Sequence, residues 1–95
     1  MCLGIYSYIG SMVTTSAYSL MQPYFQKVLN SILSSTSRDH LSGCYNLIKS
    51  FSNLPISEID KEGVYLPDFL KAVRAHYIEE LSYQFSLAMD RLDLS

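Results

Sequence analysis

Residues 66–92 read LPDFLKAVRAHYIEELSYQFSLAMDRL and carry apolar side chains at the spacing of one helical face. An apolar residue recurs every three or four positions, which is the period of an α-helix and not the alternation of a strand. Pro67 and Asp68 suit a first helical turn, because proline needs no amide partner there and a carboxylate stabilises the positive end of the helix dipole. The sequence therefore predicts a helix over 66–92. Its apolar positions are Leu66, Phe69, Leu70, Val73, Tyr77, Leu81, Phe85, Ala88 and Leu92.

A second helix is predicted upstream, over residues 37–52. Thr36 or Ser37 can cap its first turn through a side-chain hydroxyl. Asp39 suits the same end of the helix dipole. The apolar face of this helix consists of Leu41, Cys44, Tyr45, Leu47, Ile48 and Phe51.

Residues 1–26 contain no charged side chain, and Lys27 is the first. Apolar residues recur there at helical spacing. Pro23 interrupts the pattern, and a proline inside a helix costs about 3 kcal/mol. We therefore predict two helices, over 4–20 and 22–34, and keep a single kinked helix as the alternative. The opposite side of this region carries Ser, Thr, Tyr and Gln where a surface helix normally carries Lys and Glu, so we expect the domain or another chain to cover it.

Together these patterns predict an all-α fold. The connector LPISEIDKEG, at 54–63, is predicted to hold one short turn over 57–62 and to end at Gly63, because glycine adopts the left-handed backbone at low cost. A chain of 95 residues forms one domain, here 1–95. Hydrophobic residues make up 48% of it, which is enough apolar surface to offset the ordering entropy. We expect a compact bundle of about four main helices plus a short connecting turn.

The uncharged stretch from Met1 to Met21 has the length of a membrane-spanning helix. Many Gly, Ser, Thr and Tyr residues dilute its apolar character, so we expect no membrane association. The two cysteines, Cys2 and Cys44, are too few for a secreted disulfide scaffold, and the N-terminus lacks the basic region of a signal peptide. We therefore expect a cytoplasmic protein.

Charge argues against nucleic-acid binding. The net charge is −2, and the seven Lys and Arg residues are scattered along the chain. From Glu58 onward there are eight acidic and four basic residues, which gives a net charge of −4 for this part. Duplex binding depends on several clustered basic side chains that displace phosphate counterions. We therefore expect no nucleic-acid binding.

Few residue patterns in the chain carry chemistry. His40 and Cys44 are four residues apart, and with His76 and Glu80 they could form a tetrahedral metal site if their helices packed side by side. The same spacing is common on ordinary helix surfaces. Cys44 has no oxyanion donors or glycine-rich turn that would make it a nucleophile. We predict no metal site, no cofactor and no enzymatic activity.

Aromatic residues are the more informative feature, with eight Tyr and four Phe in the chain. Tyrosine is enriched in protein interfaces, although it is also an ordinary residue at the edge of a small core. We predict a small interaction module, such as an adaptor, an inhibitor or an immunity-type regulator, that occupies the surface of a partner protein. Self-association into a homo-oligomer through the same region is a further expectation. The candidate contact residues are Tyr6, Tyr8, Met12, Tyr18, Met21 and Tyr24.

The stretch EGVYLPDFLKAVRAHYIEEL, at 62–81, followed by LAMDRLDLS, at 87–95, resembles the first part of a Fis-type helix-turn-helix domain of transcription activators. In such a domain a helix leads through a short Gly/Asn loop to an Ala-rich helix and a recognition helix. The resemblance implies a DNA-associated transcriptional regulator as the alternative function. The intervening SYQFS, at 82–86, has no counterpart of the Gly/Asn loop. The matching positions are Leu66, Phe69, Leu70, Ile78, Ala88, Arg91, Leu92 and Ser95.

Overall fold

The computed structural model describes the backbone of residues 2–94 and the side chains of residues 16–93. Four helices follow one another along the chain, and no strand occurs over 2–94. The predicted all-α bundle is confirmed. The helices are α1 (Cys2–Leu33), α2 (Arg38–Asn53), α3 (Ile56–Ile59) and α4 (Pro67–Leu94).

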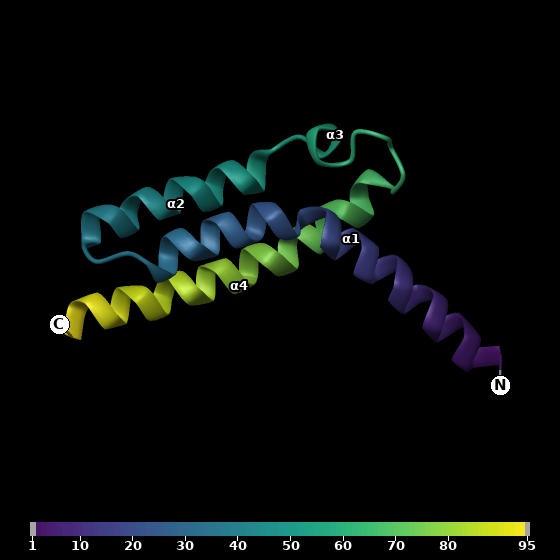
Figure 1. Ribbon diagram of the computed structural model, residues 1–95, viewed down its shortest axis with the longest axis horizontal. Coiled ribbons are helices and arrows are strands. Elements are labelled where there is room, and N and C mark those ends of the chain that lie inside the picture. Colours follow the sequence, from purple (N-terminus) through teal and green to yellow (C-terminus); the bar gives the residue numbers. More distant parts are fainter. Residues whose placement is uncertain (1, 95) are drawn as a thin grey trace.

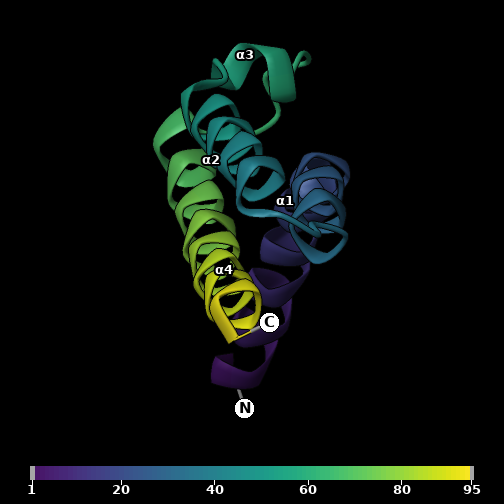
Figure 2. The ribbon, with the colours of Figure 1, turned by 90° about the vertical axis from the view of Figure 1, so that its left-hand side faces the viewer.

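The three long helices run up, down and up. Figure 1 shows α2 antiparallel to both α1 and α4, with α3 and its loops joining α2 to α4 at one end of the bundle. Seen along the bundle, the three helices lie at the corners of a triangle (Figure 2). Each helix therefore packs against the other two, which buries one apolar stripe from each.

The core lies along the axis of this triangle. Its side chains come from the stripes of the periodic apolar pattern, and α4 faces both of the other helices, as its broad apolar face requires. The buried apolar residues are Ala17, Met21, Val28 and Ile32 of α1, Leu41, Cys44, Ile48 and Phe51 of α2, Ile59 of α3, and Leu70, Val73, Leu81 and Ala88 of α4.

Two arginines of α4 bind the carboxyl ends of the other long helices. The guanidinium of Arg74 is buried and donates to the carbonyl oxygens of Phe51 and Leu54, where α2 ends. Arg91 donates to the carbonyl oxygen of Ser35, just after α1 ends, at 2.9 Å. The last carbonyls of a helix have no intrahelical donor and lie at the negative end of the dipole. Because α1 and α2 end at opposite ends of the bundle, only a helix as long as α4 can serve both.

The start of α2 and the conformation of Gly63 follow the predicted local chemistry, whereas the short turn predicted over 57–62 is observed as α3 at Ile56–Ile59. Ser37 caps α2, because its Oγ accepts the amide hydrogen of His40 at 3.1 Å. In the loop, the buried carboxylate of Asp60 accepts the amide hydrogens of Val64 and Tyr65, at 3.0 and 2.9 Å. Gly63 has a φ of 65°, the left-handed conformation that was predicted for it.

The predicted break at Pro23 is wrong, because α1 is one continuous helix from Cys2 to Leu33. Pro23 lies on the exposed side of α1, and so does Ser19, whose carbonyl loses its amide partner to the proline. Water can reach that carbonyl, so the helix continues at reduced cost. Figure 1 shows that α1 changes direction between its N-terminal and C-terminal parts, and proline is the usual cause of such a kink. The alternative of a single kinked helix is therefore correct.

Residues 2–15 of α1, which we call the N-terminal arm, lead away from the other helices, and the end of the chain projects beyond the bundle (Figure 1). The radius of gyration is 16.0 Å, with principal extents of 54, 30 and 17 Å. A globular chain of this length has a radius of gyration of about 12 Å. The excess reflects this projection. Within the described residues, no helix has both the length and the apolar character that a membrane crossing needs.

A candidate interaction surface on the first helix

The structure places the six candidate contact residues in different settings. Tyr6, Tyr8 and Met12 belong to the N-terminal arm, where the helix is described and the side chains are not. Met21 is completely buried in the core, so it offers no surface in the folded chain. Tyr18 is half-buried and Tyr24 is 36% exposed. Of the three described residues, Tyr24 has the most surface available for a partner.

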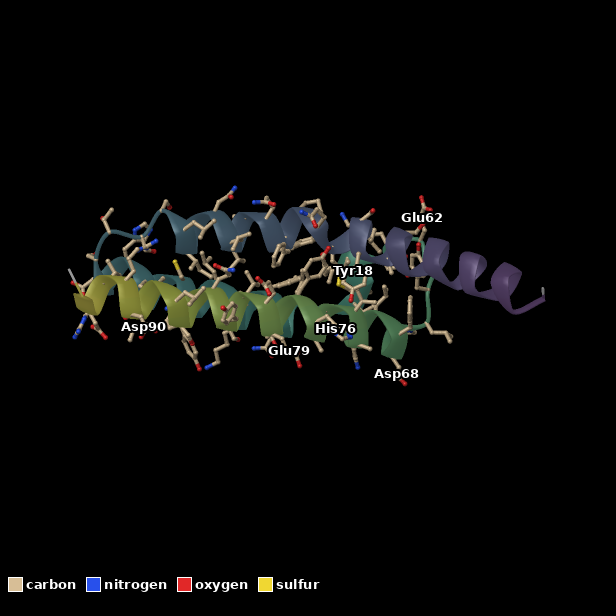
Figure 3. The ribbon with its side chains drawn as sticks, turned by 90° about the horizontal axis from the view of Figure 1, so that it is seen from below. Tyr18, Glu62, Asp68, His76, Glu79 and Asp90 are labelled. Carbon is tan, nitrogen blue, oxygen red and sulfur yellow. The ribbon has the colours of Figure 1, made fainter. Side chains whose placement is uncertain are left out.

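Tyr18 attaches α1 to α4. Its ring meets that of Tyr77 edge-on, with 5.1 Å between ring centroids and 70° between the planes. Figure 3 shows Tyr18 between the two helices, with His76 nearby on α4, and the centroids of these two rings are 6.5 Å apart. Aromatic pairs in such geometry stabilise a packed contact by about 0.5–1.5 kcal/mol beyond the area they bury. In this chain the ring of Tyr18 therefore serves an internal contact.

Tyr24 lies on the other side of α1, against α2. Its ring stacks on that of Phe51 with 6.0 Å between centroids and 4° between planes. The two rings border a shallow, mostly apolar cleft of about 210 Å³ between α1 and α2. The cleft is lined by Tyr24, Lys27, Val28, Leu47, Ser50, Phe51 and Leu54.

A larger hollow of about 580 Å³ opens where the N-terminal arm leaves the bundle. One wall is the outer side of α1 at Ser16, Ser19 and Leu20, and the other is the loop over 59–65. Val64 of this loop and Leu66, which follows the loop, are 65% and 76% exposed, which is high for apolar side chains. The lining of the hollow is mixed, with Leu20 and Val64 beside the charged side chains of Lys61 and Glu62.

The polar, uncharged side of α1 is exposed over the described residues, so the expectation that the domain covers it is wrong there. Ser19, Gln22, Gln26 and Asn30 all lie in solvent. The side-chain amides of the last three form a series of hydrogen bonds, which we call the amide ladder. In it, Gln22 Nε2 donates to Gln26 Oε1 at 3.3 Å and Gln26 Nε2 donates to Asn30 Oδ1 at 2.8 Å. Amide pairs four residues apart stabilise a helix without charge. They provide one physical reason for glutamine and asparagine at these positions.

The four residues that could have formed a metal site do not meet. Cys44 is buried and its Sγ lies 3.4 Å from Ser35 Oγ. His40 is exposed at the start of α2, whereas His76 is near the start of α4. Because α2 and α4 are antiparallel, these starts lie at opposite ends of the bundle. Over the described side chains, no three metal-binding residues come together.

The Fis-like helix pair is also absent from the described part of the chain. Residues 82–86, where that pattern needs a loop, lie in the middle of α4. Periodic apolar positions run through this stretch, and Leu81 and Ala88 on either side of it are both in the core. A single helix explains this pattern without a turn.

Tyr77 is a site residue whose role the sequence analysis missed. The sequence predicts it only on the apolar face of its helix, yet its hydroxyl shares its one hydrogen between the carbonyl oxygen of Tyr18, at 3.0 Å, and Gln22 Oε1, at 2.9 Å. Burial, and to a lesser extent the nearby Tyr18 hydroxyl, raises the pKa of Tyr77 above its ordinary value. A tyrosine on an apolar stripe is a signal for such a hydroxyl contact, because a buried hydroxyl needs a partner.

We expect this pKa shift to make stability fall at high pH. Below about pH 10 Tyr77 is protonated in both the folded and the unfolded chain, and its contribution is fully present. As pH rises through the unfolded pKa, the unfolded chain loses the proton while the folded chain retains it, so unfolding becomes more favourable until the folded pKa is passed. Urea unfolding of wild type and Tyr77→Phe across this range measures the effect. The wild type should lose stability more steeply, and parallel curves would contradict the prediction.

Comparisons of the chain with protein-family models, with curated proteins and with solved structures gave no match. The function is therefore inferred from the geometry of α1 and its surroundings.

Proposed function

We propose that this protein is a non-enzymatic interaction module that binds a partner protein through the N-terminal arm. The observation that carries the proposal is that α1 continues as a helix beyond the bundle while residues 1–26 contain no charge. A solvated helix normally carries Lys and Glu on its outer side, where they add solubility and charge pairs. The arm has neither.

A partner surface would also explain why the arm is helical. In proteins most of the stability of a helix comes from packing of its apolar face, and the arm leads away from the other helices of the bundle. Ile9 and Val13 are four residues apart and lie on one side of such a helix. An amphipathic helix that places apolar residues at this spacing into a groove is a common mode of protein recognition. An adaptor, an inhibitor or an immunity-type regulator would act in this way.

The test uses the whole chain and changes only the arm. Wild type is immobilised beside Ile9→Lys/Val13→Lys, and beside Ser7→Lys/Ser11→Lys as a matched control with the same added charge and the same spacing. Proteins retained from the native host are compared by quantitative mass spectrometry. We expect at least one protein to be retained by wild type and by the serine variant, and to be lost with the isoleucine and valine variant.

Equal retention by all three chains would contradict the proposal, and so would the absence of any retained protein. A deletion of residues 2–14 should behave like the isoleucine and valine variant. The deletion must stop there, because Ala17 is buried and Tyr18 contacts α4. Light scattering on the same proteins distinguishes self-association, for which the wild-type mass would exceed that of one chain and fall on deletion.

A further inference from the structure

One side chain of α4, Tyr77, contacts α1 on both sides of Pro23. The proline has no amide hydrogen, so the carbonyl of Ser19 one turn earlier has no intrahelical donor. A long helix bends most easily where one of its backbone hydrogen bonds is missing. Any contact that spans this point therefore controls the angle between the two parts of α1.

The contacts of Tyr77 span it. On the N-terminal side of the proline, the Tyr77 hydroxyl lies 3.0 Å from the carbonyl oxygen of Tyr18 and 2.9 Å from Gln22 Oε1, and its single hydrogen is shared between these two acceptors. Its ring also meets that of Tyr18 edge-on at 5.1 Å. On the C-terminal side, the ring packs at 35° against Phe25, with 4.5 Å between centroids.

The amide ladder extends this contact along α1. Gln22 accepts from Tyr77 through Oε1 and donates through Nε2 to Gln26, which donates in turn to Asn30. Gln22 precedes Pro23 and Gln26 follows it. Hydrogen-bonded side chains therefore bridge the position where the backbone lacks a bond.

We propose that Pro23 is a hinge in α1 and that Tyr77 is the brace that fixes it, so that the direction of the N-terminal arm is set from α4. With the hydroxyl in place, α1 has one bend angle. Without it, the residues before Pro23 keep their core packing at Ala17 and Met21 but lose the hydrogen bond to α4, and the arm samples a wider range of directions. The brace is a conformational device of the fold and does not depend on what the arm binds.

The experiment measures the direction of the arm. Spin labels are attached at Ser11→Cys in the arm and at Ser86→Cys, an exposed position of α4, in a chain with Cys2→Ser and Cys44→Ala. Pulsed electron paramagnetic resonance then gives the distribution of distances between the labels. We expect one narrow distribution for the otherwise unchanged chain and a clearly broader one for Tyr77→Phe. The matched control is Tyr83→Phe, which removes the hydroxyl of a tyrosine 57% exposed on the same helix and should leave the distribution narrow.

Two further measurements separate a brace from a general loss of packing. A label pair at Ser42→Cys and Ser86→Cys, on exposed positions of α2 and α4, should give the same distribution with Tyr77 and with Tyr77→Phe. Adding Pro23→Ala supplies a backbone amide that can donate to the carbonyl of Ser19. In that background Tyr77→Phe should broaden the distance distribution of the arm much less. The proposal is overturned if Tyr77→Phe leaves the arm distribution unchanged, if the parent chain is already as broad, or if the broadening persists in full without the proline.

Discussion

Arg74→Ala is expected to lower the free energy of unfolding by about 3 kcal/mol, a large part of the 5–15 kcal/mol that stabilises a typical domain. Arg74 is 9% exposed and donates to the carbonyl oxygens of Phe51 and Leu54. Removing it takes the charged donor from both carbonyls, of which Phe51 keeps only the amide of Leu54, and hydrogen bonds from a charged donor are worth roughly 1.5–3 kcal/mol each. Burial lowers the pKa of Arg74, but a guanidinium titrates so far above neutrality that the donor stays charged.

Urea unfolding followed by circular dichroism measures this loss. The control is Lys71→Ala, an exposed cation one turn earlier on α4, which should change stability by less than about 0.5 kcal/mol. Arg74→Met tests the cause, because methionine keeps much of the side-chain volume but supplies no donor. If the methionine variant were as stable as wild type, packing and not hydrogen bonding would be the contribution of Arg74.

Leu81→Ala is expected to cost about 3 kcal/mol for a different reason. Leu81 is completely buried near the middle of α4, the helix that faces both α1 and α2. Truncating a buried leucine loses its transfer free energy and leaves a cavity that the surrounding helices fill only in part, and such changes cost 2–5 kcal/mol. The helix itself is not weakened, because alanine has the higher helix propensity.

The matched control lies on the same helix. Leu87 is 44% exposed, so Leu87→Ala removes the same atoms with less burial and should cost under about 1 kcal/mol. Thermal and urea unfolding of the two variants should therefore separate them clearly. Equal losses would show that Leu81 lies in a mobile part of the protein and not in a packed core.

The helix boundaries show which features follow from local sequence. The predicted helices over 37–52 and 66–92 are observed as Arg38–Asn53 and Pro67–Leu94. The sequence features that predict these helices are local. Apolar residues three or four positions apart, a capping serine and a glycine at a helix end each involve residues within one or two helical turns. The residues that line the core of α2 and α4 belong to the same pattern.

Pro23 shows where local reasoning fails. Its intrinsic cost in a helix predicts a break, but that cost depends on whether the carbonyl one turn earlier is buried or exposed. Only packing decides this, because it selects the side of α1 that faces the core. The same choice buries Met21 and leaves Tyr24 partly exposed, although both fit the predicted contact set equally well by residue type.

The candidate site depends even more on long-range contacts. Tyr77 meets Tyr18, a residue 59 positions earlier, and Arg74 and Arg91 reach the ends of two helices far away in sequence. No periodic pattern encodes such pairs, because they depend on how three helices are rotated and aligned along their axes. The predicted contact set indicated that α1 matters, but not which of its rings has an internal partner.

The sequence by itself determined that the chain is helical, roughly where α2 and α4 lie, and that its first 26 residues carry no charge. Tertiary structure decided that α1 passes through Pro23, that Met21 is internal, and that α4 binds the ends of both neighbouring helices. The reason is physical. A helix forms from hydrogen bonds four residues apart, whereas the side it turns to solvent is fixed by side chains that meet only after the bundle has assembled.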